Sequence, residues 1–263
     1  MKFLALALLF AAAPVAAQTP DERDTVAAAA ERGQMIYAYD RAAWLGTDDL
    51  FAKLPDATTR IAGYIADGPA DAPRLTFYDK GAVPQAVYVA HLRRGKLFDG
   101  KLLGATDDRT LSPDLLRRIA ALASAQKAAV AAGLRPCAGQ PFNAVVLPAE
   151  PAGVIRVYLL TPQVDTAHLP FGGHYEIDVA ADGSTAPPRA FTKACMTMPA
   201  HPPQDRMSAA VVSHLLDPVP TEIHVFDSLA LGKPVIVETL KPTPRLWTID
   251  GAHITGPRAL PSR

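Results

Sequence analysis

Residues 61–103 read IAGYIADGPADAPRLTFYDKGAVPQAVYVAHLRRGKLFDGKLL, and they contain four short runs rich in β-branched, aromatic and leucine side chains. The runs cover residues 61–66, 74–78, 85–92 and 96–103. Turn-forming groups such as Asp67-Gly68-Pro69 and Arg94-Gly95 separate them. Strands this close together have room only for hairpins, because a parallel connection needs a long crossover. These residues therefore predict an antiparallel meander of four strands.

A helix is predicted directly after the meander, over residues 113–132. Ser112 can cap its first turn, Pro113 suits the first helical position, and Gly133 is a typical helix end. Apolar side chains recur on one face at helical spacing. They are Leu115, Ile119, Leu122 and Val130. We expect this helix to pack on the core.

The segment before the meander is predicted to hold two helices and one strand. Thr19-Pro20-Asp21-Glu22 has the pattern of a helix start, with a capping residue and a glutamate three positions later. That helix is expected to end near Arg32, because Gly33 supplies a left-handed stop. Residues 35–40 (MIYAYD) alternate as a strand does, and residues 41–53 are predicted to form a second short helix.

Residues 1–17 (MKFLALALLFAAAPVAA) have the pattern of a secretory signal peptide. One lysine precedes a short uncharged apolar run, and small residues at Val15 and Ala17 favour cleavage after Ala17. The run is too short to span a bilayer. We therefore expect the mature chain to be periplasmic or secreted and not to span a membrane.

The second half of the chain is distinguished by proline, with 18 of the 25 prolines at Pro136 or later. Strands are predicted at residues 144–147, 154–160, 174–179, 189–193, 210–214, 222–226, 234–239 and 246–249. Prolines lie mainly between these runs, where they cost no ladder hydrogen bonds. Residues 197–208 are the most polar and proline-rich stretch, and we predict a surface loop there.

Together these patterns predict an α+β fold of mostly antiparallel sheets, with two or three helices in the N-terminal half. We expect an N-terminal α+β lobe over residues 18–135 and a β-rich C-terminal lobe over residues 136–263. Trp44 and Trp247 are predicted to lie in the core or between the lobes rather than to hold a ligand.

Only two cysteines are present, Cys137 and Cys195. An exported chain meets an oxidising environment, in which two thiols tend to be joined. No Cys-x-x-Cys pattern points to thiol catalysis. The sequence therefore predicts a structural disulfide between Cys137 and Cys195 within the C-terminal lobe.

Composition excludes two classes of protein. Apolar residues make up 49% of the chain and charged residues 20%, so a disordered chain is excluded. The 26 basic residues balance the 26 acidic ones, and aromatic residues are not interleaved with basic ones. We therefore expect no nucleic-acid partner.

The densest group of potential metal ligands lies in residues 214–224, which contain two histidines and two carboxylates. On a strand over residues 222–226, Glu222 and His224 would share a face. His214, Asp217 and His224 would then be nitrogen and oxygen ligands suited to zinc, and Glu222 could act as general base on a bound water. No His-Glu-x-x-His pattern is present. Structural histidines and loop carboxylates are the alternative interpretation.

Residues 171–254 resemble JAB/MPN domains, the fold of JAMM metallo-isopeptidases, in the order of their elements. A glycine-led hairpin (Phe171-Gly172-Gly173-His174-Tyr175) precedes a strand that ends in Val212-Ser213-His214. A Pro-Thr turn at Pro220 leads into an amphipathic stretch, and two further strand runs follow.

The catalytic motif of that family is incomplete here. His214 stands at the place of the first histidine, but Leu216 replaces the second one. Thr221 and His224 stand where a serine and an aspartate are expected, and Pro170 stands where a glutamate is expected. The resemblance therefore implies an inactive relative more readily than a protease.

The whole chain also resembles uncharacterised exported bacterial proteins. The phrases Asp40-Arg41-Ala42-Ala43-Trp44 and Pro220-Thr221-Glu222-Ile223-His224-Val225-Phe226 carry that similarity. It implies no activity.

Three functions remain open. The first is a non-catalytic binding or envelope-associated accessory factor, because the nucleophile-elbow and nucleotide-cradle motifs are missing. The second is a zinc-dependent hydrolase or peptidase that uses His214, Asp217, His224 and Glu222. The third is a peptide-binding or cell-wall-binding module with an apolar groove between its lobes.

Overall fold

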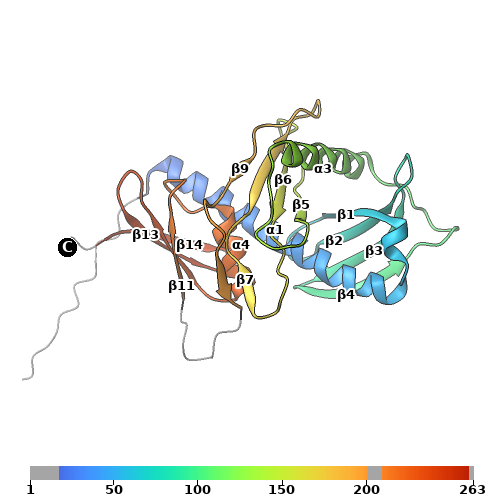
Figure 1. The fold of residues 1–263 in the computed structure, drawn as a ribbon, viewed down its shortest axis with the longest axis horizontal. Coiled ribbons are helices and arrows are strands. Elements are labelled where there is room, and N and C mark those ends of the chain that lie inside the picture. Colours follow the sequence, from blue (N-terminus) through green and yellow to red (C-terminus); the bar gives the residue numbers. More distant parts are fainter. Residues whose placement is uncertain (1–17, 201–208, 261–263) are drawn as a thin grey trace, which may run out of the picture.

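The computed structural model describes residues 18–200 and 209–260 (Figure 1). Within these residues it has four helices and 14 strands in mostly antiparallel sheets, so the predicted α+β class is confirmed. The helices are α1 (Pro20–Lys53), α2 (Ala57–Arg60), α3 (Pro113–Ala131) and α4 (Glu222–Leu231). The predicted signal peptide at 1–17 lies outside the described residues, as do residues 201–208 of the predicted loop.

The first sheet is the meander that the sequence predicts. Its strands β1 (Ile61–Asp67), β2 (Arg74–Asp79), β3 (Ala86–Arg93) and β4 (Lys96–Leu102) pair in chain order, and every pair is antiparallel. The helix predicted after it is α3, with Ser112 accepting a hydrogen bond from the Leu115 amide at 3.3 Å.

The second sheet has the order β5-β6-β8-β9, and α3 packs on it. Its strands are β5 (Asn143–Val146), β6 (Ile155–Leu160), β8 (Tyr175–Val179) and β9 (Arg189–Ala190). A two-stranded ribbon of β7 (His168–Pro170) and β10 (Thr197–Pro199) was not predicted. Both strands are only three residues long, too short to give a periodic signal.

The third sheet contains β11 (Ala210–His214), β12 (Val235–Thr239), β13 (Arg245–Asp250) and β14 (His253–Ala259). The first two are parallel, and α4 is the crossover between them. The strand predicted at 222–226 is therefore wrong. Thr221 caps a helix there, and Gly232 ends it in the left-handed conformation with φ 63°.

The predictions for residues 33–40 are also wrong, because α1 is one helix of 34 residues that continues through them. Residues 41–53 are helical as predicted, but they are the second part of α1 and not a separate helix. Neither the stop at Gly33 nor the strand at 35–40 occurs. Buried positions recur every three or four residues through the whole helix. They are Val26, Ala29, Gly33, Ile36, Tyr39, Ala43, Gly46 and Leu50. Thr19 and Glu22 do form the predicted capping box.

Gly33 allows close packing instead of ending the helix. A Cβ atom at this position would lie 2.6 Å from the carbonyl oxygen of Glu222 and would also overlap Val225. Real Cβ atoms essentially never come so close to a carbonyl oxygen. A glycine in α1 therefore lets α4 approach its backbone directly.

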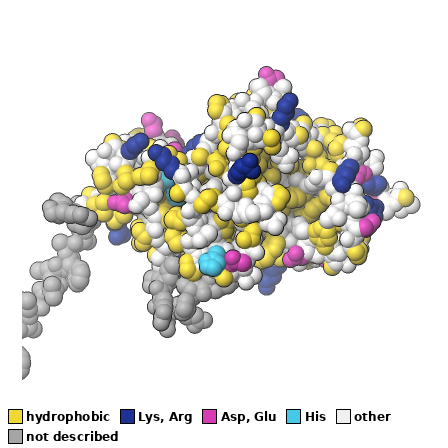
Figure 2. Space-filling view, viewed as in Figure 1, with side chains coloured by type: hydrophobic (Ala, Val, Ile, Leu, Met, Phe, Trp, Pro, Cys, Tyr) yellow, Lys and Arg dark blue, Asp and Glu magenta, His cyan; other side chains and the backbone are white. Residues whose placement is uncertain are grey.

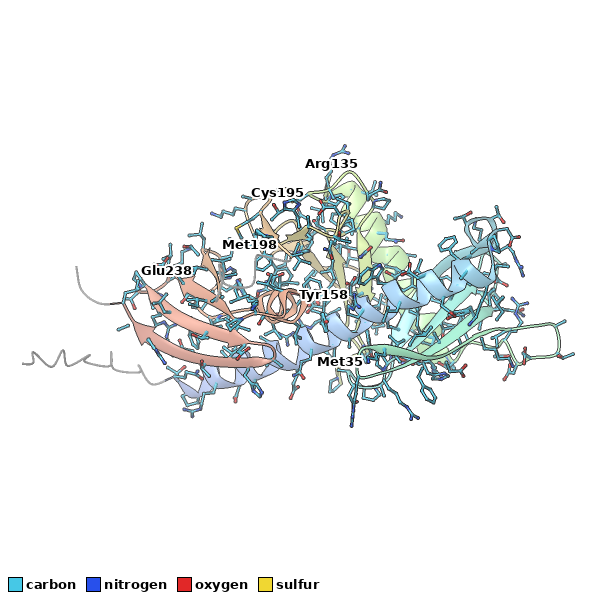
Figure 3. The ribbon with its side chains drawn as sticks, turned by 90° about the horizontal axis from the view of Figure 1, so that it is seen from below. Met35, Arg135, Tyr158, Cys195, Met198 and Glu238 are labelled. Atoms are coloured by element: carbon cyan, nitrogen blue, oxygen red, sulfur yellow. A yellow bond between two sulfur atoms is a disulfide. The ribbon has the colours of Figure 1, made fainter. Side chains whose placement is uncertain are left out.

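Helix α1 connects the two ends of the molecule (Figure 3). It extends along the β11–β14 sheet at one end and the β1–β4 sheet at the other, with Met35 near its middle. All three hydrophobic clusters contain residues from both sides of residue 135. The two predicted lobes thus share their core. Trp247 is buried there as predicted, with 1% of its surface exposed.

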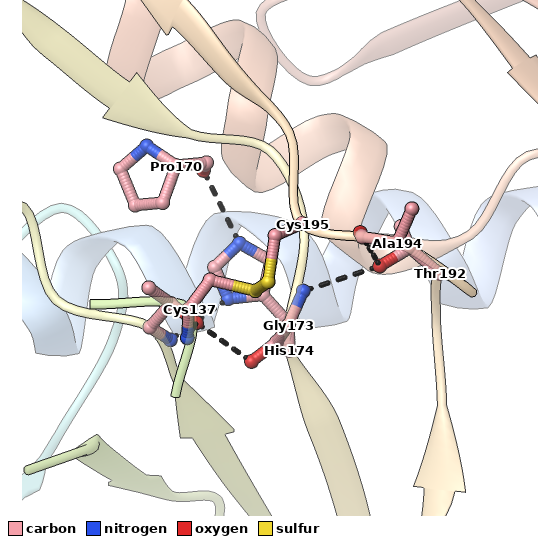
Figure 4. Close-up of a disulfide and its surroundings, with 8 residues drawn as sticks. Cys137, Pro170, Gly173, His174, Thr192, Ala194 and Cys195 are labelled. Carbon is pink, nitrogen blue, oxygen red and sulfur yellow. Dashed lines mark hydrogen bonds between the residues drawn. A yellow bond between two sulfur atoms is a disulfide. The ribbon is translucent and has the colours of Figure 1, made fainter. Parts of the chain in front are cut away.

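Cys137 and Cys195 form the predicted disulfide, with their Cα atoms 5.5 Å apart (Figure 4). His174 lies beside it, and its Nδ1 accepts a hydrogen bond from the Thr161 amide at 3.1 Å. Burial lowers the pKa of His174 to about 4, so this ring is neutral. The bond closes a loop of 58 positions and stabilises the fold by about 4 kcal/mol in the chain-entropy picture.

Candidate functional site

The four residues of the predicted zinc cluster lie together around the start of α4. His214 ends β11, Asp217 lies in the turn that follows, and Glu222 and His224 occupy the first helical turn. His214, Glu222 and His224 are all buried. Because residues 222–226 are helical, Glu222 and His224 are about 200° apart around the axis and do not share a face.

His214 and Asp217 are in contact at the end of β11. Nε2 of His214 lies 2.9 Å from Oδ2 of Asp217, and Arg189 donates to Oδ1 of Asp217 at 3.0 Å. Burial alone would raise the pKa of Asp217, but the hydrogen bond from His214 and the charge of Arg189 outweigh it and lower this pKa. The two imidazole rings meet edge to face, 4.7 Å between centroids. Burial, together with His214, lowers the pKa of His224 to about 3.

Glu222 belongs to a larger network of paired charges. It accepts a hydrogen bond from the Tyr158 hydroxyl at 2.8 Å and another from Nε of Arg32 at 3.4 Å. Nη1 of Arg189 lies 3.8 Å from it and donates to Glu176 at 2.8 Å. Burial and the charge of Glu222 raise the pKa of Glu176. This network joins α1, the β5–β9 sheet and α4.

These contacts do not fit a metal site. Both oxygens of Asp217 are already engaged by His214 and Arg189, and Nδ1 of His224 accepts a hydrogen bond from the Thr221 amide at 3.0 Å. Glu222 is equally engaged, which leaves it unsuited to act as a base. Across residues 18–200 and 209–260, no three His, Cys, Asp or Glu side chains are grouped to hold a metal. The proposed zinc ligands lie close together, but their contacts do not otherwise support the zinc hypothesis.

A pocket of about 460 Å³ lies elsewhere on the molecule, on another side of α4. Its walls come from α1, the segment after β6, β7 and its flanks, and α4. Apolar side chains dominate the lining. They include Trp44, Leu160, Val164, Leu169, Phe171, Phe226 and Leu231. A cavity of this size and character is typical of small-molecule sites.

Asp227 is the buried carboxyl group of this pocket. It follows Phe226 on α4 and has only 3% of its surface exposed. Its Oδ1 atom is fully buried, and no described residue donates a hydrogen bond to it. Burial raises the pKa of Asp227 well above the ordinary value and so favours the protonated form of this side chain in the free protein.

A second carboxyl group, Asp40 on α1, lines the same pocket. Asn143 donates a hydrogen bond to it at 3.2 Å. Burial raises the pKa of Asp40 to about 6, although the hydrogen bond from Asn143 and the charge of Arg41 act in the opposite direction. The guanidinium of Arg41 lies over the Trp44 ring, 4.2 Å from its centroid.

Trp44 was predicted to lie in the core or between the lobes. The core is the wrong position, because the side chain is 51% exposed. It lies at the pocket, whose walls come from both predicted lobes. The sequence analysis also missed Asp227, because the strand predicted over residues 222–226 stops one residue before it. A carboxylate isolated among apolar residues in IHVFDSLAL is the signal that could have revealed it. The sequence did not single out Asp40 as a binding residue either.

Among the described residues, the face of the molecule drawn in Figure 2 carries no large charged patch. Lys and Arg side chains are scattered over that face singly or in small groups.

No helix among the described residues is both long and apolar enough to cross a bilayer. No protein-family model, curated protein or solved structure matches this chain.

Proposed function

We propose that this protein is a non-catalytic binding protein that holds a small, mainly apolar molecule in the pocket between α1 and α4. The observation that carries the proposal is the cavity of about 460 Å³ with its aromatic and aliphatic walls. Pockets of roughly 300 to 1,000 Å³ accommodate drug-sized ligands. The paired charges around Glu222 leave no free base or nucleophile, which favours binding over catalysis.

The setting in which it binds is part of the same proposal. The disulfide is in keeping with an oxidising compartment. Together with the signal-peptide pattern of residues 1–17, it supports a periplasmic or secreted carrier, or an accessory factor of the cell envelope.

The test is a titration with N-phenyl-1-naphthylamine, an uncharged dye that fluoresces in apolar surroundings. We expect saturable binding at one site, because the lining is largely apolar. Ala230→Trp places an indole on the pocket wall and should weaken dye binding by at least about tenfold.

Ala120→Trp is the matched control, since Ala120 is an exposed residue of α3 outside the lining. It should bind the dye as the wild type does. Thermal melting of both variants establishes that each is folded. Absence of saturable binding, or equal binding by the folded Ala230→Trp variant, would overturn the proposed function.

A further inference from the structure

An apolar ligand alone leaves Asp227 unexplained. A buried polar group without a hydrogen-bond partner costs roughly 1 to 3 kcal/mol, and folded proteins contain few of them. Oδ1 of Asp227 is such a group, and Asp227 is one of the residues that line the pocket. Because Oδ1 itself is closed to solvent, a hydrogen-bond donor in the pocket would reach it after a rotation of the side chain.

The charges around Asp227 restrict what that donor can be. From α1 the lining receives Tyr37, Asp40 and Arg41, and from the segment after β6 it receives Asp165. The strands β12 and β13, which also pack on α4, contribute no residue to the lining. Among the lining residues that the structure describes, acidic groups thus outnumber the one cation, Arg41, which is stacked on Trp44.

We propose that the pocket takes molecules that combine an apolar body with one protonated amine, and that the ammonium group pairs with the Asp227 carboxylate. This inference rests on the proposed function and adds the chemical class of the ligand. The aromatic rings of Phe171 and Phe226 in the lining suit a cation, because the face of an aromatic ring carries negative charge.

An amine fits better than the other classes of ligand. An anion would lie close to the acidic residues Asp40 and Asp165, which would repel it. It would also leave Asp227 without a positively charged partner. A neutral alcohol could donate one hydrogen bond, but it would gain no charge attraction. In a water-poor pocket an ion pair is stronger than in bulk water. A monovalent ammonium would also balance the charge that Asp227 acquires on ionisation.

Binding of the amine should release a proton. In the free protein Asp227 is protonated because of its burial, and pairing with an ammonium favours the carboxylate. The Asp227 O–H bond breaks, its proton passes to solvent, and the amine keeps all of its own protons. Affinity for an amine should therefore rise with pH while Asp227 is protonated in the free protein, and affinity for an alcohol should not.

The experiment compares 4-phenylbutylamine with 4-phenylbutan-1-ol by isothermal titration calorimetry of the wild-type protein and two variants. We expect the wild type to prefer the amine, since a charge-assisted hydrogen bond contributes roughly 1.5 to 3 kcal/mol, or about tenfold to 100-fold in affinity. Asp227→Asn should lose that preference and keep its affinity for the alcohol.

Asp165→Asn is the control within the same pocket. Asp165 is exposed, and its carboxylate accepts hydrogen bonds from the amides of Ala167 and His168. An asparagine can preserve both bonds, so this variant should keep the amine preference. Titrations in buffers of different ionisation enthalpy should show proton release for the amine only.

The outcomes separate this inference from the proposed function. If the amine and the alcohol bind equally well and Ala230→Trp blocks both, the pocket binds apolar ligands but the inferred class is wrong. Amine preference that persists in Asp227→Asn would likewise overturn the role of Asp227. If neither compound nor the dye binds, the proposed function fails together with this inference.

Discussion

Glu222 and Asp227 lie five residues apart on α4, and their exposed fractions are 1% and 3%. Glu222 meets Tyr158, Arg32 and Arg189, whereas no described residue donates a hydrogen bond to Asp227. The same residue chemistry on one helix therefore serves two purposes. The paired carboxylate joins parts of the fold, and the unpaired one is available to a ligand.

The pairing explains why the residues that the sequence singled out do not form a reactive centre. A carboxylate that already accepts hydrogen bonds from a guanidinium group and a hydroxyl, with a second guanidinium close by, is not free to take part in other contacts. The same contacts tie α1 to α4 and to the β5–β9 sheet. Asp227 lies outside this network and among the residues that line the pocket.

Removing Glu222 should have the largest effect on stability. Glu222→Ala leaves Arg32 and Arg189 facing each other without their shared partner, and breaking a buried ion pair costs about 3 to 5 kcal/mol. Urea unfolding measures the loss. Glu31→Ala is the control, since Glu31 is exposed on the same helix as Arg32, and it should change stability by less than about 0.5 kcal/mol. A loss below about 1 kcal/mol for Glu222→Ala would contradict a structural role for this network.

Replacing the ionisable carboxyl group of Asp227 should instead increase the stability of the protein. The folded state keeps the Asp227 proton at a pH where the unfolded state has lost it, because burial raises the folded pKa. Stability therefore falls as pH rises from about 4 towards the folded pKa. Asp227→Asn has no ionisable group at this position and should therefore stabilise the ligand-free protein at pH 7.

The pH dependence distinguishes this cause from others. His224 and His174 have lowered pKa values, so they contribute stability that is present above about pH 6.5 and is lost as pH falls towards 4 and 3. They are unchanged in Asp227→Asn, and the difference between variant and wild type isolates Asp227. That difference should vanish near pH 4. A variant that is less stable than the wild type at pH 7 would refute the unpaired state of Asp227.

Chelation should have no effect. If the side chains of His214, Asp217 and Glu222 are engaged with their protein partners, purified protein should contain no stoichiometric zinc. EDTA should then leave its melting temperature unchanged. Elemental analysis and thermal melting measure both. A stoichiometric metal that is lost in the double variant His214→Ala/His224→Ala would revive the hydrolase hypothesis and overturn the interpretation of this cluster as an ion network.

The sequence predictions succeeded where the structure depends on contacts between neighbouring residues, and they failed where it depends on contacts between distant parts of the chain. The meander at 61–103 and helix α3 were predicted closely, because hairpin turns and the Ser112 cap are local features. The failure at Gly33 arose because glycine ends many helices, while here it faces the backbone of α4. The failure at 222–226 arose because five residues are too few to distinguish alternation from a helix.

By itself the sequence determined the α+β class, the first sheet and the disulfide, since neighbouring residues form turns and caps and only two cysteines are available to pair. Tertiary structure alone decided which carboxyl group on α4 is paired with positively charged side chains. The Arg32 side chain that pairs with Glu222 comes from 190 residues earlier in the chain. Asp227 differs from Glu222 only in what the folded chain brings to it, because a buried charge depends on partners that local sequence does not reveal.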